Sequence, residues 1–577
     1  MLPTRTLGVL ALVLAAPAAA SPPASDVPTA ARYIVVEQDA AGNLTPVWEK
    51  RVRLELPAAT PAGIAAAASG GPDGGEPAIE ATVVDAGGGV RYREVVRPTA
   101  WLRGEFATGH GAVSPIEGHF VPRDISHFVV RVPEIAGARL VLRRPGGAVT
   151  EVPAAPPAAS AELDAVTATS IVAAIQNSGS PANRLDLLIV GEGYTASQYS
   201  KFLADVNALL ASFFAATPYA EYQGFLNIAA LYVTSQQEGA DHPAYRSDCL
   251  PGDPTCCSDT TAVADPLAGR LVDTAFDAQF CTLGIQRLLT VDDRKVLAAA
   301  AAVPDWDTVI VLVNDSTYGG SGGQVAVIST NSRATEVAQH ELGHSFSLLA
   351  DEYETAYPGY PGCSDVVSSA SCEANVTDET VRDRIKWAPW IHPDTPLPTS
   401  PADPAFAGVV GLFEGARYRS TGIYRPRRQC LMRELGRSFC EVCRQEFVLR
   451  LYRGGWGVPA AGIDPVDPGG ESPPPGPIGV SIGNTLHFWV RLVRPAATPS
   501  LAVSWLIDGE PVAGADGEHL AWAPPHPGSF HVEIAVHDAT GFLHEELAAP
   551  ASRRQWEVTV WSGRHPRRRV PAGASAP

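Results

Sequence analysis

The chain has 577 residues, which is too long for one ordinary domain and predicts about three to four of them. Its composition, 45% hydrophobic and 18% charged, is that of a folded globular protein. The formal charge of -19 argues against a general nucleic-acid binder, because contacts with phosphates need clustered Lys and Arg side chains.

The N-terminus has the pattern of a secretory signal peptide over residues 1–20. Arg5 supplies a short positive region, residues 7–16 form an apolar core, and three alanines at 18–20 form a small-residue cleavage site. This core is too short to span a membrane, and no other stretch approaches roughly 18 uninterrupted apolar residues. We therefore expect a soluble exported protein that is secreted, periplasmic or held at the cell surface, without stable membrane insertion.

Residues 25–150 predict an N-terminal antiparallel β-sandwich. Stretches such as RYIVVEQD and WEKRVRLELP alternate apolar and polar residues, and turn residues separate them. The Pro- and Ala-rich stretch EVPAAPPAASAELDA (151–165) predicts a linker.

In residues 166–455 the pattern changes to strands that alternate with helices. LDLLIVGEGYT (185–195) and DTVIVLVN (307–314) are nearly continuous apolar runs, which are typical of buried strands. Residues 197–219 between them repeat apolar side chains at helical spacing. This alternation predicts an α/β layer arrangement.

All nine cysteines lie in this central region, and an exported protein is expected to join them in disulfides. The odd count leaves at least one thiol unpaired or joined to another chain. Cys440 and Cys443 form a CxxC, but with Cys430 they supply three thiolates, and a structural zinc site normally needs four ligands. We therefore expect disulfides here and not a second metal site.

The stretch VAQHELGHSFSLLADEY (337–353) contains an HExxH motif. On a helix, His340 and His344 project from one face about a turn apart, so both can bind one zinc ion. Glu341 lies beside that face, where it can take a proton from a zinc-bound water that attacks a carbonyl. Ala338, Leu342, Phe346 and Leu349 lie on the opposite side and are expected to anchor the helix to the core.

The C-terminal part predicts a second β-rich domain. GIDPVDPGGESPPPGPIG (462–479) is typical of a stiff Pro-rich linker. Residues 478–562 return to short alternating strands, which predict an immunoglobulin-like β-sandwich. Residues 563–577 predict a disordered basic tail, and the whole chain is expected to be a multidomain α+β/all-β protein.

Six segments occur in order through residues 183–452: LLIVGEGYT, FLNIAALYVTSQQEGADHP, YGGSGG, HELGHSFSLLADEY, GIYRPRRQCLMR and FCEVC. In this order they resemble the IgA peptidase family of bacterial zinc metallopeptidases, which is related to the metzincins. The resemblance implies a metzincin-like catalytic domain behind an N-terminal β-sandwich. It also implies that Met432 forms a Met-turn, a tight turn beneath the metal that supports the site without binding the ion.

The third metal ligand departs from the metzincin pattern HExxHxxGxxH/D, since position 347 is Ser and position 350 is Ala. By resemblance to the family's LADEY, we expect Asp351 to be the ligand, with Glu352 as the reserve. On an unbroken helix Asp351 would lie about 16 Å along the axis from His340, so the helix must break near residues 348–350. Alternatively both acids cap or pair locally, and a distant Glu or His completes the site.

Further residues near the motif are candidates for the substrate cleft. The Gly-rich stretch YGGSGG (318–323) is expected to form a flexible wall, and QVAVIST (324–330) an exposed strand that pairs with an extended peptide. Tyr353, Tyr418 and Tyr424 could stabilise an oxyanion, but for each one alone packing is the favoured interpretation.

These observations together predict an exported zinc-dependent metalloendopeptidase that acts on protein or peptide substrates, with Glu341 as the catalytic residue. Two alternatives stay open. One is a non-catalytic surface adhesin that retains a vestigial site, and the other is a zinc amidase that acts on cell-wall peptides.

Overall fold

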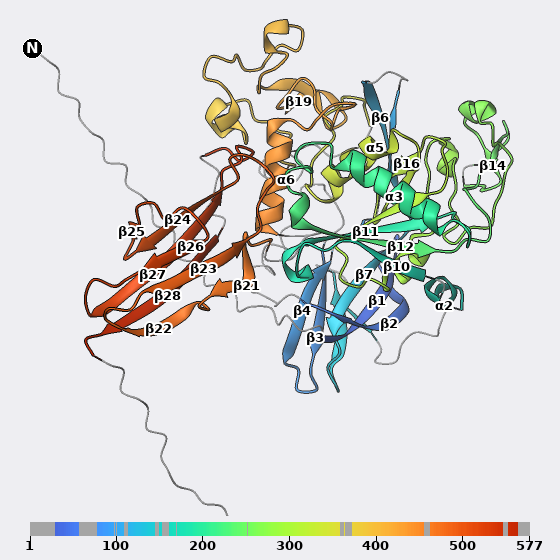
Figure 1. Cartoon of the computed structure of the whole chain (residues 1–577). Coiled ribbons are helices and arrows are strands. Elements are labelled where there is room, and N and C mark those ends of the chain that lie inside the picture. The colour runs from blue at the N-terminus through green and yellow to red at the C-terminus, as the bar shows by residue number, and fades with distance from the viewer. Residues whose placement is uncertain are drawn as a thin grey trace, which may run out of the picture.

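The structure is a computed structural model in which β-sheets predominate and five α-helices lie in the part of the chain that it describes. It describes residues 29–56, 78–96, 98–99, 101–108, 113–144, 149–152, 161–168, 170–250, 252–357, 360, 363, 372–454, 462–545 and 552–563. The expected signal peptide, much of the first linker and nearly all of the basic tail lie outside these residues. The prediction of a β-rich multidomain chain is confirmed (Figure 1). No helix among the described residues is long and apolar enough to cross a membrane.

The N-terminal region contains two antiparallel sheets around a shared core. One sheet has the order β2(Leu44–Leu54)-β1(Thr29–Asp39)-β7(Ile125–Pro133), and the other the order β4(Val90–Val96)-β3(Ile79–Val84)-β8(Arg139–Arg143)-β9(Val149–Val152). Ile34 and Val36 of β1 point into the core between these sheets, whereas Tyr33 and Val35 point to the central region. Both faces of β1 are buried, which explains its continuous apolar run.

A hairpin of β5 (Trp101–Ala107) and β6 (Ser114–Pro122) leaves this region and packs against the central region of the chain. In Figure 1, β6 lies beside α5 and β16, at the end of the molecule opposite to β3 and β4. β6 pairs with β20 (Glu434–Leu435), and β5 forms an antiparallel bridge to Gly322. The sequence pattern did not predict this excursion.

The central region is built on a six-stranded sheet. Its order is β10(Ser170–Gln176)-β12(Leu226–Val233)-β11(Leu185–Glu192)-β15(Thr308–Val313)-β17(Ala326–Ser329)-β16(Gly320–Ser321). The four inner strands are parallel, and the two edge strands are antiparallel to their neighbours. One face packs on α3 (Tyr199–Phe213), α5 (Ala334–Ser345) and α6 (Glu441–Arg453), and the other on α2 (Ala161–Ala168) and α4 (Asp293–Ala300).

The edge of this sheet corrects one expectation. The strand in QVAVIST is β17, which is covered by β15 on one side and β16 on the other, so it is not exposed. The Gly-rich stretch that was expected to be only a flexible wall supplies the edge strand β16. Glycine permits this because an added Cβ at Gly320 would lie 2.8 Å from the backbone oxygen of Val327.

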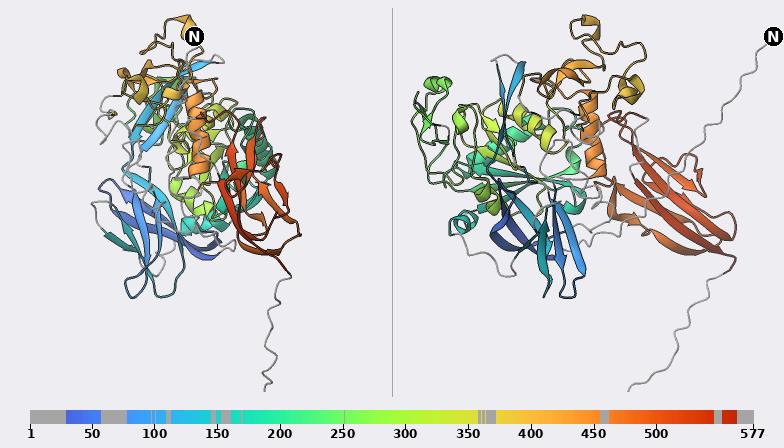
Figure 2. Two further views of the ribbon diagram at one scale, coloured as in Figure 1. Left: turned by 90° about the vertical axis from the view of Figure 1, so that its left-hand side faces the viewer. Right: turned by 180° about the vertical axis from the view of Figure 1, so that it is seen from behind.

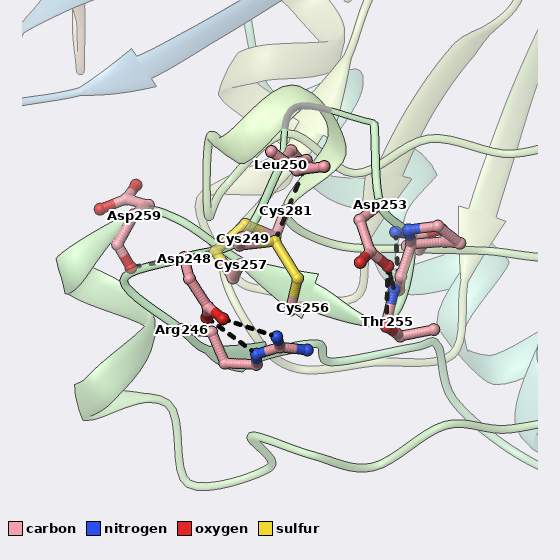
Figure 3. Close-up of a disulfide and its surroundings, with 12 residues drawn as sticks. Arg246, Asp248, Cys249, Leu250, Asp253, Thr255, Cys256, Cys257, Asp259 and Cys281 are labelled. Atoms are coloured by element: carbon pink, nitrogen blue, oxygen red, sulfur yellow. Dashed lines mark hydrogen bonds and ion pairs between the residues drawn. A yellow bond between two sulfur atoms is a disulfide. The ribbon is translucent and has the colours of Figure 1, made fainter.

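Six of the nine cysteines form disulfides within the described residues: Cys249–Cys256, Cys257–Cys281 and Cys363–Cys372. The first two brace the loop that carries β13 (Ala244–Tyr245) and β14 (Cys256–Cys257) (Figure 3). The remaining three, Cys430, Cys440 and Cys443, are buried and not bonded to one another. β18 (Phe413–Ala416) and β19 (Arg419–Arg425) form a separate hairpin, which precedes these three cysteines in the sequence.

The C-terminal region contains two further sheets, at one side of the central region (Figures 1 and 2). Their orders are β21(Val466–Ser472)-β23(Leu486–Leu492)-β26(His519–Trp522) and β22(Gly476–Ser481)-β28(Ser552–Trp561)-β27(Gly528–Asp538)-β24(Leu501–Ile507)-β25(Glu510–Pro511). β21 and most of β22 fall inside the predicted Pro-rich linker. Both are edge strands, where proline is tolerated because one side of the strand needs no ladder hydrogen bonds. The buried Arg184–Asp467 ion pair, at 3.2 Å, joins this region to the central one.

Candidate metal centre

Helix α5 brings the two histidines of the HExxH motif together. The Nε2 atoms of His340 and His344 are 3.1 Å apart, and both side chains are buried. Ala338, Leu342 and Phe346 lie in the core on the other side of the helix, as its periodicity predicts. Packing therefore fixes the direction in which the two imidazoles point.

Each histidine is also oriented through its second ring nitrogen. Nδ1 of His340 donates to the carbonyl oxygen of Leu431 at 3.0 Å, and Nδ1 of His344 donates to that of Leu349 at 2.7 Å. A carbonyl can only accept, so Nδ1 carries the hydrogen in both rings. The Nε2 lone pairs are thereby left free for a metal, which is the usual arrangement around ligating histidines.

The chain turns back after α5 and carries Asp351 to the same place. The helix ends at Ser345, and Leu348 takes a left-handed conformation with φ of 50°. Backbone hydrogen bonds from Leu348 to His344 (3.1 Å) and from Leu349 to Gly343 (2.9 Å) close the turn. The predicted helix break is therefore present, with leucine in the position of strained backbone where many turns use glycine.

Three potential ligand atoms converge in this way. Oδ1 of Asp351 lies 3.3 Å from Nε2 of His340 and 3.2 Å from Nε2 of His344. Four ligands placed tetrahedrally at 2.0–2.1 Å from a zinc ion are about 3.3 Å apart, so the spacing fits such an ion. Oδ1 is buried, and no described residue gives it a well-aligned hydrogen bond. Two imidazoles and a carboxylate are also a donor set that suits zinc.

A fourth side chain, Glu105 of β5, completes the cluster and was missed by sequence reasoning. Its Oε2 lies 2.6 Å from Nε2 of His340, and its Oε1 lies 3.1 Å from Nε2 of His344. The carboxylate is buried, with 3% of its side chain exposed. Because Glu105 is far from the HExxH motif along the chain, no local sequence pattern pointed to it as part of the cluster. An acid between Gly104 and Phe106 in a mostly apolar strand was the available hint.

The charges in this cluster favour a cation. Burial alone would lower the pKa of both imidazoles, but the Glu105 and Asp351 carboxylates outweigh it: the pKa of His344 is raised to about 9, and that of His340 well above its ordinary value. Burial and Glu105 act to raise the pKa of Asp351, but the two histidines lower it. The cluster thus stabilises positive charge, either as protons on the imidazoles or as a metal ion that replaces them.

Glu341 lies beside the cluster and is packed against the edge strand. A Cβ added to Gly322 would lie 1.8 Å from Oε2 of Glu341, so a larger residue at this point would displace the carboxylate. Burial, followed by the charge of Glu105, raises the pKa of Glu341 well above its ordinary value. A carboxylate with a raised pKa binds a proton more readily, which suits a group that accepts and returns one.

Met432 lies directly beneath the helix. It is fully buried, and a Cβ added to Gly343 would lie 2.6 Å from its Sδ atom. The carbonyl of Met432 accepts a hydrogen bond from the backbone nitrogen of Glu352 at 2.7 Å. This bond ties the turn at Met432 to the segment that carries Asp351.

The reserve ligand, Glu352, points away from the histidines and toward the free cysteines, since its Oε1 lies 3.3 Å from Sγ of Cys443. Among the tyrosines, Tyr418 donates its hydroxyl hydrogen to Oδ2 of Asp351. Tyr353 lies 3.4 Å from the Tyr418 hydroxyl. Tyr424 sits on β19, where its backbone pairs with Thr377, and it makes no described side-chain contact with the cluster.

The Glu105 strand also lies against the sheet edge. Arg103 and Gly322 exchange two backbone hydrogen bonds of 2.9 Å, which is the pattern of an antiparallel pair. Two residues further along β5, Glu105 meets the histidines. β5 therefore runs along the edge strand and across the cluster, as an extended peptide would when added to a sheet edge.

Comparisons with known proteins bear on this site. The family model described as IgA Peptidase M64 matches residues 173–248, 255–408 and 400–450, which include α5, the Asp351 turn and the Met432 turn. No curated protein matches. A solved structure described as "IG27 protein domain" is 19% identical, with 16% of this chain and 91% of that chain covered and a TM-score of 0.11. The resemblance seen in the motifs is thus confirmed. The central part of this chain, residues 173–450, is therefore similar to the IgA Peptidase M64 family, and this similarity supports a metallopeptidase.

Proposed function

We propose that the protein is an exported zinc-dependent metalloendopeptidase that hydrolyses peptide bonds of protein substrates. The convergence of Nε2 of His340, Nε2 of His344 and Oδ1 of Asp351 at 3.1–3.3 Å carries this proposal. These three side chains would hold the ion. Zinc in such a site supplies an acidified water and polarises a carbonyl oxygen.

The protein's own residues do the rest of the chemistry. Glu341 takes the proton of the attacking water at its carboxylate and returns it to the amine that leaves. Tyr418 fixes Oδ2 of Asp351, so that Oδ1 faces the ion. Met432 acts as the Met-turn, since it fills the space under Gly343 between the two ligand histidines.

The arrangement of β5 gives a latent form of this enzyme. Its backbone pairs with Gly322 where a substrate strand would pair, and the Glu105 carboxylate contacts both ligand histidines. If a metal ion were held by these histidines, Glu105 would occupy the fourth ligand position that a catalytic site keeps for water. The hairpin has to move away from the edge before a substrate can take its place.

The flanking regions have supporting roles in this proposal. We assign residues 25–150 to an N-terminal β-sandwich, 166–455 to the metzincin-like catalytic domain, and 478–562, extended back to β21, to an immunoglobulin-like β-sandwich. The two flanking β-sandwiches would hold the catalytic domain near a surface or a protein substrate. The three disulfides support an exported protein, which residues 1–20 would direct as a signal peptide.

The test compares Glu341→Gln with Glu336→Gln, a substitution on the first turn of the same helix. Purified mature protein of each kind is given casein and a library of short peptides, and its zinc content is measured. We expect Glu341→Gln to keep its zinc and to lose about 10²–10⁴-fold in turnover, because general base catalysis contributes that much. Glu336→Gln should resemble the wild type. Equal activity of both variants would contradict the proposal, and cleavage of cell-wall peptides alone would favour the amidase.

A further inference from the structure

A second group of buried side chains lies behind the first. Cys430 precedes the Met432 turn, Cys440 and Cys443 begin α6, and Glu352 follows Asp351. Each offers one ligand atom, and these atoms lie within 4.8 Å of one another. The exposed fractions are 4% for Cys440 and 0% for the other three residues.

The distances fit a metal ion. Sγ of Cys443 lies 3.6 Å from Sγ of Cys430 and 3.5 Å from Sγ of Cys440. Oε1 of Glu352 lies 3.3 Å from Sγ of Cys443. Tetrahedral zinc with Zn–S bonds of about 2.3 Å places its sulfurs about 3.8 Å apart, and a sulfur and a carboxylate oxygen about 3.6 Å apart. These three separations are each within about 0.3 Å of the tetrahedral values.

Glu352 is hard to explain without a cation. Its Oε1 accepts a hydrogen bond from Nδ2 of Asn375 at 3.0 Å, but its buried Oε2 has no hydrogen-bond donor among the described residues. A buried carboxylate with an unsatisfied oxygen is costly unless a positive charge is near. The amide of Asn375 also holds both backbone groups of Ala350, so the direction of Glu352 is fixed.

A disulfide explains this cluster less well. Bonded sulfurs are about 2.05 Å apart, and here each separation between neighbours is at least 3.5 Å. A disulfide between two of these cysteines would also leave the third thiol unpaired, next to the buried Glu352. The expectation of disulfides, which rested on the lack of a fourth ligand in the sequence, does not hold for these three cysteines, because their thiols are free. Glu352 lies beside them from a distant segment.

We propose that the three cysteines and Glu352 bind a structural zinc ion. Four anionic ligands exceed the charge of one such ion by two, and the buried guanidinium of Arg425 lies close enough to act on the Glu352 charge. The ion fastens together three segments that all support the histidine site. Glu352 adjoins Asp351, Cys430 adjoins the Leu431 carbonyl that orients His340, and the two remaining cysteines anchor α6.

This inference goes beyond the proposed function, because the thiolate site does not depend on the histidine site being catalytic. The first experiment uses the full mature wild-type protein. We expect about two zinc ions per chain, with X-ray absorption showing Zn–S contacts at about 2.3 Å. Substitution with Co²⁺ should give sulfur-to-cobalt charge-transfer absorption, which imidazole and carboxylate ligands cannot produce. Protein with no sulfur-bound metal and with a disulfide among the three cysteines by mass spectrometry would overturn the inference, and would leave the proposed function untouched.

Variants then assign the two ions separately. The His340→Ala/His344→Ala double variant should keep about one ion per chain together with the sulfur-to-cobalt signal. Glu352→Gln and Cys443→Ser should weaken or lose that signal. The Cys249→Ser/Cys256→Ser variant is the matched control, since it removes sulfurs that form a remote disulfide and should keep the signal in full. If a cysteine variant does not fold, the wild-type spectrum alone decides between the two outcomes. A signal that survives in Cys443→Ser with undiminished intensity would contradict the assignment.

Discussion

Replacing Tyr418 by Phe should weaken metal binding without changing the shape of the site. The hydroxyl of Tyr418 donates to Oδ2 of Asp351, and its ring is buried among Tyr353, Tyr357 and Tyr360. Phenylalanine keeps the ring contacts and removes the donor, which frees the carboxylate to rotate away from the histidines. Loss of such a contact behind a metal ligand typically costs 10–100-fold in affinity, or about 1.4–2.7 kcal/mol.

The assay is a competition titration of zinc between the protein and a chromophoric chelator, at fixed pH and salt. Tyr424→Phe is the matched control, because Tyr424 lies on the adjacent strand and its phenol makes no described contact with Asp351. We expect a zinc affinity 10–100-fold lower for Tyr418→Phe, an unchanged affinity for the control, and nearly normal turnover of both at saturating zinc. A Tyr418→Phe affinity within about twofold of the wild type would refute the role given to this hydroxyl and weaken the assignment of Asp351.

Three further predictions follow from the same geometry. Glu105→Ala should speed the removal of metal by a chelator and raise peptide cleavage several-fold. Glu117 is an exposed acid on the same hairpin, and Glu117→Ala should change neither. Slower cleavage with metal retained would make Glu105 a catalytic group. Gly322→Ala should lower turnover while zinc stays bound, because its Cβ would displace the Glu341 carboxylate, and a fully active variant would contradict this packing. His242 is buried between Asp265 at 2.7 Å and Asp315 at 3.0 Å. Burial acts to lower the pKa of His242, but hydrogen bonds to these acids raise it. Its contribution to stability is therefore complete below the unfolded pKa of about 6.5 and is lost as pH rises through the folded pKa. Thermal denaturation of His242→Gln between about pH 6 and 9 should lack this loss, and an identical slope in both proteins would count against it.

The parts of the site that share one helix could be predicted from the sequence. His340, Glu341 and His344 follow from helical periodicity, and the helix break before Asp351 follows from the axial distance that an unbroken helix would impose. The turn itself could not be anticipated in detail, because Leu348 adopts the left-handed conformation that glycine usually provides. The structure shows that backbone hydrogen bonds from Leu348 and Leu349 back to α5 stabilise this conformation.

The groups that come from distant segments could not be predicted. Glu105 reaches the histidines because the β5–β6 hairpin crosses from one region to another, and strand alternation carries no information about such a docking. Glu352 was considered beside Asp351 as a ligand of the same ion. In the fold the two neighbours contact different clusters, Asp351 the histidines and Glu352 the cysteines.

In the proposed function, a metal ion held by His340, His344 and Asp351 enables peptide-bond hydrolysis. The most direct measurement follows cleavage of a fluorogenic peptide library by purified mature protein during removal and return of zinc, with bound metal counted at each step. The proposal predicts that activity falls with the histidine-bound ion and returns in proportion as that ion is replaced. Activity that persists after this ion has been removed, or that fails to return once it is restored to a folded protein, would contradict it.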